Sequence, residues 1–187
     1  MNKKHISILL FFISISLGLP VSAENKNIFS FKTGSFSIDN KSQTIGTSPF
    51  VFDTDSTGIF AFEYERLLKN NISVGAGFIT YANDIVSGSS TSSSATSIHV
   101  MAIGKKYFAM TNNILPYLGV GFGTGTSTID GIGFGPALQG MVGIKFRAKN
   151  VSLLIEYRAV SATVEDIDDE KLDVSGDGVF GGVSFSF

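Results

Sequence analysis

The chain has 187 residues, of which 43% are hydrophobic and 16% are charged, and its formal net charge is −2. It contains no cysteine, which excludes a disulfide framework and a thiolate metal site. The slight excess of acidic residues argues against a general nucleic-acid binder, because such proteins are normally basic.

The first segment has the composition of a secretory leader. Lys3 and Lys4 precede an uncharged apolar run, Ile6 to Leu19, and Val21-Ser22-Ala23 supplies small residues for cleavage. This run is shorter than the roughly 20 residues of a membrane-spanning helix, which favours a removed leader over a retained anchor. We predict a signal peptide over residues 1–23 and one domain over residues 24–187. That domain has 12 basic and 16 acidic residues, a formal charge of −4.

Apolar and polar residues then alternate in eight segments, each close to the 9–11 residues of a tilted membrane strand. Glycine and β-branched or aromatic residues dominate these segments, and no helical periodicity is evident. In chain order the predicted strands are Ile28 to Ile38, Gly58 to Leu68, Ile72 to Tyr81, Ser97 to Ala109, Ile114 to Thr124, Pro136 to Ala148, Val151 to Thr163, and Gly178 to Phe187.

The connections between these strands alternate in length. Three are short and contain asparagine, around Asn70, Asn112 and Asn150. The other four are long, and run from Asp39 to Thr57, Ala82 to Thr96, Gly125 to Gly135 and Val164 to Asp177. Short turns at one rim and long loops at the other are typical of an outer-membrane barrel, whose turns lie in the periplasm and whose loops lie outside the cell. The predicted fold is an all-β, eight-stranded, antiparallel up-and-down transmembrane β-barrel.

The last predicted strand places Val179, Val183, Phe185 and Phe187 on one face and serine on the other. Together with the leader, the segments 60–66 (FAFEYER) and 115–121 (LPYLGVG), and the terminal Phe187, this strand resembles the small outer-membrane barrels of the opacity-protein and OmpA/OmpX type. The resemblance implies a Gram-negative outer-membrane location, and a role of Phe187 in the signal read by the barrel-assembly machinery. It does not imply an activity, because this architecture carries adhesins, anchors, channels and enzymes.

Strand parity predicts which side chains face the barrel interior. In the strand 58–68, the aromatic residues Phe60 and Phe62 share the lipid-facing parity, and Glu63 and Glu65 share the other. An eight-stranded barrel has an interior just wide enough to be filled by side chains, so we expect the inward charges to pair across the lumen and plug it. The predicted charge network consists of Lys32, Glu63, Glu65, Lys105, Lys145, Arg147, Glu156 and Arg158. A proton- or ion-gating network is the alternative interpretation.

Candidate sites for chemistry are few. His99 is the only histidine after the leader, and it is followed by Val100, Met101 and Ala102, whereas the lipid A deacylases of this architecture carry His-x-Ser-Asn. We therefore predict no enzyme and no cofactor. Asp173 to Gly178 matches the opening of a calcium loop, but the closing glutamate is missing, which excludes a complete EF-hand. Weak divalent-cation binding by the acidic segment 164–177 stays open.

The predicted function is that of a structural or surface-interaction protein, in which a plugged barrel presents four loops outside the cell. A narrow channel for small or hydrophobic solutes is the first alternative, and a lipid-modifying enzyme the second. The expected partners are outer-membrane lipid and lipopolysaccharide, the barrel-assembly machinery during insertion, and a host or cell-surface ligand at the loops.

Overall fold

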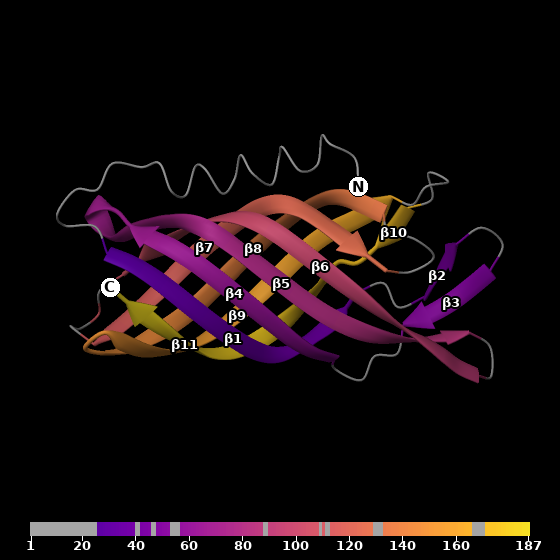
Figure 1. Cartoon of the computed structure of the whole chain (residues 1–187), viewed down its shortest axis with the longest axis horizontal. Coiled ribbons are helices and arrows are strands. Elements are labelled where there is room, and N and C mark those ends of the chain that lie inside the picture. Colours follow the sequence, from indigo (N-terminus) through magenta and orange to yellow (C-terminus); the bar gives the residue numbers. More distant parts are fainter. Residues whose placement is uncertain are drawn as a thin grey trace.

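The computed structural model shows a closed antiparallel barrel with strongly tilted strands (Figure 1). It describes residues 26–39, 42–45, 48–52, 57–87, 90–108, 110, 113–128, 133–165 and 171–187. The predicted leader, residues 1–23, lies outside the described residues. Eight strands close the barrel: β1 (Lys26–Ile38), β4 (Thr57–Leu67), β5 (Ile72–Ser87), β6 (Ser90–Tyr107), β7 (Ile114–Ser127), β8 (Gly133–Ala148), β9 (Val151–Glu165) and β11 (Gly176–Ser186). The predicted fold class is confirmed.

Each barrel strand pairs with the next one along the chain, and β11 returns to pair with β1. At this seam Phe29 lies opposite Phe185, and the backbone N–H of Phe187 donates to the carbonyl oxygen of Asn27 over 3.0 Å. The N–H of Asn27 donates in return to the carbonyl of Phe187 over 2.9 Å. Closure thus satisfies the edge groups that an open sheet would leave unpaired, which is what a sheet in lipid requires.

Exposed and buried side chains alternate along the strands, most regularly in β8 and β9. The outward residues are largely apolar; Phe60, Leu138, Leu153, Ile155 and Val179 are among the most exposed. Facing water, so large an apolar surface would promote aggregation, whereas in a bilayer it is solvated by acyl chains. The exterior therefore fits lipid, with the parity that the sequence predicts for β4, β8 and β9. Among the described residues no helix has the length and apolar composition of a membrane span.

Two of the long connections contain further strands. β2 (Ser42–Ile45) and β3 (Ser48–Phe52) form a hairpin within the predicted loop 39–57, and β3 pairs with the end of β5. β10 (Lys171–Asp173) pairs with β9 within the predicted loop 164–177. All three lie at the same end of the barrel, opposite the C-terminus (Figure 1). This end is the long-loop end, and the opposite end is the short-turn end.

The predicted loop 82–96 is wrong in extent. β5 continues to Ser87 and β6 begins at Ser90, so that the two strands stay paired well beyond the predicted strand ends. The serine-rich sequence hides this extension because a hairpin outside the membrane has water on both faces and needs no apolar alternation.

The short turns contain the three non-glycine residues with positive φ among the described residues. Asn70 and Asn71 belong to η1 (Lys69–Asn71), the turn between β4 and β5, and Lys149 begins the two-residue turn between β8 and β9. Asparagine tolerates this left-handed conformation better than most residues. Lysine has no such tolerance, so the positive φ at Lys149 is a strained conformation.

Replacing Lys149, whose φ is 57°, with glycine is expected to raise the free energy of unfolding by up to about 1 kcal/mol. Glycine adopts positive φ without a steric penalty, and this gain exceeds its entropic cost in a tight turn. Urea unfolding of the folded barrel in lipid vesicles measures the change. Asn150→Gly is the control, since Asn150 does not have positive φ; a gain from Asn150→Gly as large as that from Lys149→Gly would contradict the explanation.

Candidate functional site

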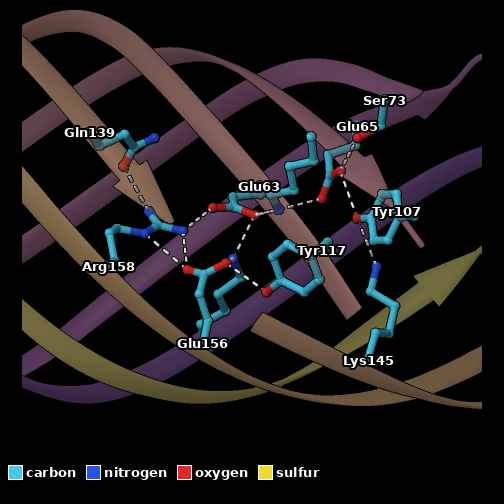
Figure 2. A network of polar contacts seen from close by, with 11 residues as sticks. Glu63, Glu65, Ser73, Tyr107, Tyr117, Gln139, Lys145, Glu156 and Arg158 are labelled. Atoms are coloured by element: carbon cyan, nitrogen blue, oxygen red, sulfur yellow. Dashed lines mark hydrogen bonds and ion pairs between the residues drawn. The ribbon is translucent and has the colours of Figure 1, made fainter. Parts of the chain in front are cut away.

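The charged groups predicted to face inward meet in the lumen near the short-turn end of the barrel. Figure 2 shows the carboxylates of Glu63 and Glu65 on β4 and of Glu156 on β9 converging with cationic side chains from other strands. The three carboxylates are completely buried. A charge removed from water in this way is tolerated only if it is paired and its hydrogen-bonding capacity is satisfied.

Glu63 is the centre of the network, because it contacts three cations. Its Oε2 accepts hydrogen bonds from Lys32 Nζ over 2.7 Å and from Lys105 Nζ over 2.5 Å. Its Oε1 accepts a hydrogen bond from the guanidinium of Arg158. These contacts join β1, β6 and β9 to β4 across the lumen.

Glu156 contacts two of the same cations, Lys32 and Arg158. Its Oε2 accepts from Lys32 Nζ and from the hydroxyl of Tyr117, each over 2.7 Å. Its Oε1 accepts from Arg158 Nε over 2.9 Å. Arg158 Nη1 donates onward to the side-chain oxygen of Gln139 over 3.1 Å, so that the guanidinium is held on several sides.

Glu65 completes the network toward the short turns. It accepts hydrogen bonds from Lys105 Nζ over 2.7 Å, from Ser73 Oγ over 2.5 Å and from the Tyr107 hydroxyl over 2.9 Å. Lys145 Nζ donates to the same Tyr107 hydroxyl over 3.2 Å and lies 4.9 Å from the centre of its ring. Lys145 therefore joins the network through a neutral tyrosine, whereas the other cations contact carboxylates directly.

The structure brings together seven of the eight predicted network residues. Arg147 is the exception: it lies half-buried at the end of β8, and its side chain takes no part in the network among the described residues. Four partners were not predicted, namely Ser73, Tyr107, Tyr117 and Gln139. All four have the inward parity of their strands, which is the signal that could have found them.

Glycines on the inward face make room for these long side chains. A Cβ at Gly119 would lie 2.8 Å from Lys105 Cγ and 2.7 Å from Met141 Cγ, and one at Gly121 would lie 2.4 Å from Gln139 Nε2. At Gly75 and Gly123 the close neighbour is instead backbone of the adjacent strand, at 1.9 and 2.0 Å. Inward glycines thus serve two purposes, side-chain space and close strand approach.

A second, apolar layer fills the lumen toward the long-loop end. Phe36, Ile59, Ile79 and Phe180 are almost completely buried there. Val174, which follows β10, is also fully buried against this layer, and Leu172 of β10 is nearly so. This layer was not predicted, because the expected pattern of apolar outside and polar inside assigns no apolar core to a small barrel. The lumen is therefore plugged twice, by charge pairs and by packed hydrocarbon.

His99 belongs to the apolar layer. Its Nε2 lies 2.9 Å from the Tyr81 hydroxyl, which donates to the carbonyl oxygen of Val174 over 2.8 Å. The two rings stack with centroids 5.3 Å apart. The hydroxyl can donate its single proton only once, so His99 donates from Nε2 and its Nδ1 accepts nothing among the described residues. The histidine thereby orients the Tyr81 hydroxyl, which holds the segment after β10 over the barrel mouth.

The calcium-like sequence after residue 172 has a structural use. Asp173 Oδ1 accepts from the backbone N–H of Ser175 over 2.9 Å, and Gly176 and Asp177 already belong to β11. Within the part of the chain that the structure describes, no three histidine, cysteine, aspartate or glutamate side chains gather as a metal-binding group would. Residues 166–170 of the acidic segment lie outside that part.

Comparisons with solved structures give the fold a place among known proteins. Neisserial surface protein A superposes with a TM-score of 0.61 at 14% identity, over 87% of this chain and 97% of that one. OprG of Pseudomonas aeruginosa gives 0.59 at 13% identity, over 87% and 95% of the two chains. The chain has the fold of the small outer-membrane barrels. The N-terminal barrel of Pseudomonas aeruginosa OprF has a TM-score of 0.50 at 12% identity, over 87% and 97%.

These likenesses confirm the predicted resemblance at the level of the fold, and at such low identity they concern the fold alone. No protein-family model matches the chain, and no curated protein matches it.

Proposed function

We propose that the chain is an integral outer-membrane protein whose plugged barrel anchors a surface-exposed loop end, and that the loop end makes the functional contacts. The observation that carries the proposal is the filled lumen. The charge network around Glu63 and the apolar layer around Ile59 occupy successive levels of the interior. A barrel filled at both levels is suited to anchoring and poorly suited to conduction.

The composition of the loop end supports an interaction with a cationic partner. The strand ends and connections on that side contain only two lysines, Lys41 and Lys171. They contain twelve acidic residues: Asp39, Asp53, Asp55, Asp84, Asp130, Glu165, Asp166, Asp168, Asp169, Glu170, Asp173 and Asp177. Such a surface attracts basic ligands and repels anionic ones, with a strength that falls as salt increases. A basic region of a host or neighbouring cell-surface molecule therefore suits it better than the phosphates of lipopolysaccharide.

The proposal also includes no catalytic role. Nε2 of His99 is hydrogen-bonded to the Tyr81 hydroxyl, and this hydroxyl donates its proton to the carbonyl oxygen of Val174. A nucleophile activated by a histidine needs a serine in hydrogen-bond reach and a group that orients the ring, and the contacts of His99 are used instead to hold the barrel mouth. Other proposed partners are membrane lipid around the exterior, and the barrel-assembly machinery, which would read Phe187 during insertion.

Heat-modifiability together with protease protection tests the membrane assignment. We expect the protein in the outer-membrane fraction, a faster gel band before boiling than after it, and cleavage by external protease confined to the loop end. The reason is that the closed barrel keeps its compact shape in detergent until heat breaks the strand pairing. A soluble periplasmic protein without a mobility shift would overturn the assignment.

Planar-bilayer recording separates the anchor from the channel alternative. We expect no steady conductance from the wild-type barrel. A wild-type conductance that disappears when Lys145 and Glu156 are replaced would contradict the plugged barrel and support conduction through the charge network.

A further inference from the structure

Cationic side chains gather at the short-turn end of the barrel, outside the charge network. Lys26 starts β1, Lys69 lies in the turn η1, and Lys149 lies in the turn between β8 and β9. Lys106 and Arg147 lie at the short-turn ends of β6 and β8. Together these five residues form a group that we name the basic rim: Lys26, Lys69, Lys106, Arg147 and Lys149.

The strand register places the basic rim at one level. Lys26 lies opposite Leu67, two residues before Lys69, and Lys106 lies opposite Ile72, the first residue after η1. Lys106 Nζ also donates to the carbonyl oxygen of Asn70 in that turn. The side chains of Lys26, Lys69, Lys106 and Lys149 are exposed.

The basic rim has no acidic counterpart among the described residues of that end. Glu65 is the acidic side chain nearest to the short turns there, and it is buried and bonded to Lys105, Ser73 and Tyr107. The exposed positive charges are therefore not neutralised by acidic side chains of the described chain. The loop end has the opposite composition, so that the molecule is electrically polarised along the barrel axis.

Apolar side chains that fit lipid border the basic rim directly. Ile72, Phe146, Val151 and Phe187 are exposed at the same end of the barrel. Lysine next to such a belt extends its ammonium group to the level of the lipid head groups while its methylene stem stays against the acyl chains. At that level the available anion is a lipid phosphate.

We propose that the basic rim binds the phosphate groups of anionic phospholipids in the leaflet that the short turns face. The proposal rests on the membrane insertion proposed above. Positive charges from five strand ends or turns then fix the depth and the orientation of the barrel: the basic rim is attracted to an anionic leaflet and the acidic loop end is repelled by one.

Electron spin resonance of spin-labelled lipids tests the proposal on the full folded chain. The protein is inserted into phosphatidylcholine vesicles that contain a trace of spin-labelled phosphatidylglycerol or of spin-labelled phosphatidylcholine. The fraction of label immobilised at the barrel surface gives the relative affinity for the two lipids. We expect phosphatidylglycerol to be preferred about fivefold at low salt, as one close lysine worth about 1 kcal/mol would produce.

Two matched double variants assign the preference to the basic rim. Lys69→Gln with Lys149→Gln should reduce the preference at least by half, whereas Lys41→Gln with Lys171→Gln removes the same charge from the loop end and should leave it unchanged. Lys106 is kept, because it holds the turn at Asn70. High salt should abolish the preference, since screening at about 1 M acts within about 3 Å.

The possible failures can be told apart. Equal immobilisation of both labels would overturn the lipid proposal while leaving the membrane assignment intact, and would direct the search to an acidic periplasmic macromolecule. A preference reduced equally by both double variants would overturn the assignment to the rim. If no lipid label is immobilised, the chain does not insert, and the proposed function itself fails.

Discussion

Replacing Glu63 with glutamine is expected to lower the free energy of unfolding by about 3–5 kcal/mol, the cost of breaking a buried ion pair. Glutamine keeps the shape of the side chain but removes the charge that Lys32, Lys105 and Arg158 share. Glu156 and Glu65 then have to balance these three cations alone, in a lumen where the side chains of Glu63 and Lys32 have no water-accessible surface. The measurement is urea unfolding in lipid vesicles, followed by the heat-modifiable gel band.

Glu165→Gln is the matched control for the same chemical change. Glu165 pairs with Lys171 over 3.2 Å, but the two side chains are 52% and 68% exposed. An exposed pair of this kind contributes at most about 1 kcal/mol, because water screens it and both side chains lose freedom in forming it. Equal effects of Glu63→Gln and Glu165→Gln would contradict a central role of Glu63.

A double variant separates the pairing energy from the cost of an unpaired charge. Lys32→Met lowers the number of buried cations, so the pair Lys32→Met with Glu63→Gln should lose less stability than the sum of the two single changes. The physical reason is that each single change leaves a charge without its partner, and the double change removes both. An additive result would indicate that Lys32 is balanced by Glu156 alone.

Alternation along single strands was sufficient to predict which charges face the lumen. Lys32, Glu63 and Glu156 each lie between outward apolar residues, and the period of two leaves them only one face. It could not predict which of them meet. Contact across the lumen depends on the tilt and stagger of the strands, which are properties of the closed barrel and not of one segment. Tyr107 and Tyr117 share the inward parity, but parity alone does not assign an uncharged residue to a charge network.

The apolar layer shows where the pattern misleads. Phe36 and Ile59 are inward residues with the composition expected of the lipid face, and the membrane rule of polar inside and apolar outside does not allow for them. The layer also depends on Val174, which lies after β10 and is held by the Tyr81 hydroxyl at its carbonyl oxygen and by the Ala162 carbonyl oxygen at its N–H. A contact between residues so far apart in sequence has no local signal.

Arg66 illustrates a further limit. The position of Arg66 in β4 has the parity of the lipid face, which predicts a side chain that extends to the membrane interface. Arg66 is nevertheless only 8% exposed. Parity thus does not predict the burial of a side chain at the end of a strand.

Replacing Gly143 with valine is expected to lower the free energy of unfolding by about 3 kcal/mol or more. A Cβ at Gly143 would lie 2.5 Å from Tyr117 Cζ and 2.8 Å from the carbonyl oxygen of Ile155, so the ring of Tyr117 has to move. Overpacking costs about 1–3 kcal/mol, and losing the hydrogen bond from Tyr117 to Glu156 costs about 1.5–3 kcal/mol, although the two costs overlap.

Gly140→Val on the same strand is the control, because Gly140 faces outward and a Cβ there has no neighbour within 4 Å. That change should stay within about 0.5 kcal/mol of wild type in the same urea experiment. If Gly140→Val is as costly as Gly143→Val, the loss reflects strand glycines in general, and Tyr117 does not depend on the space that Gly143 leaves for it.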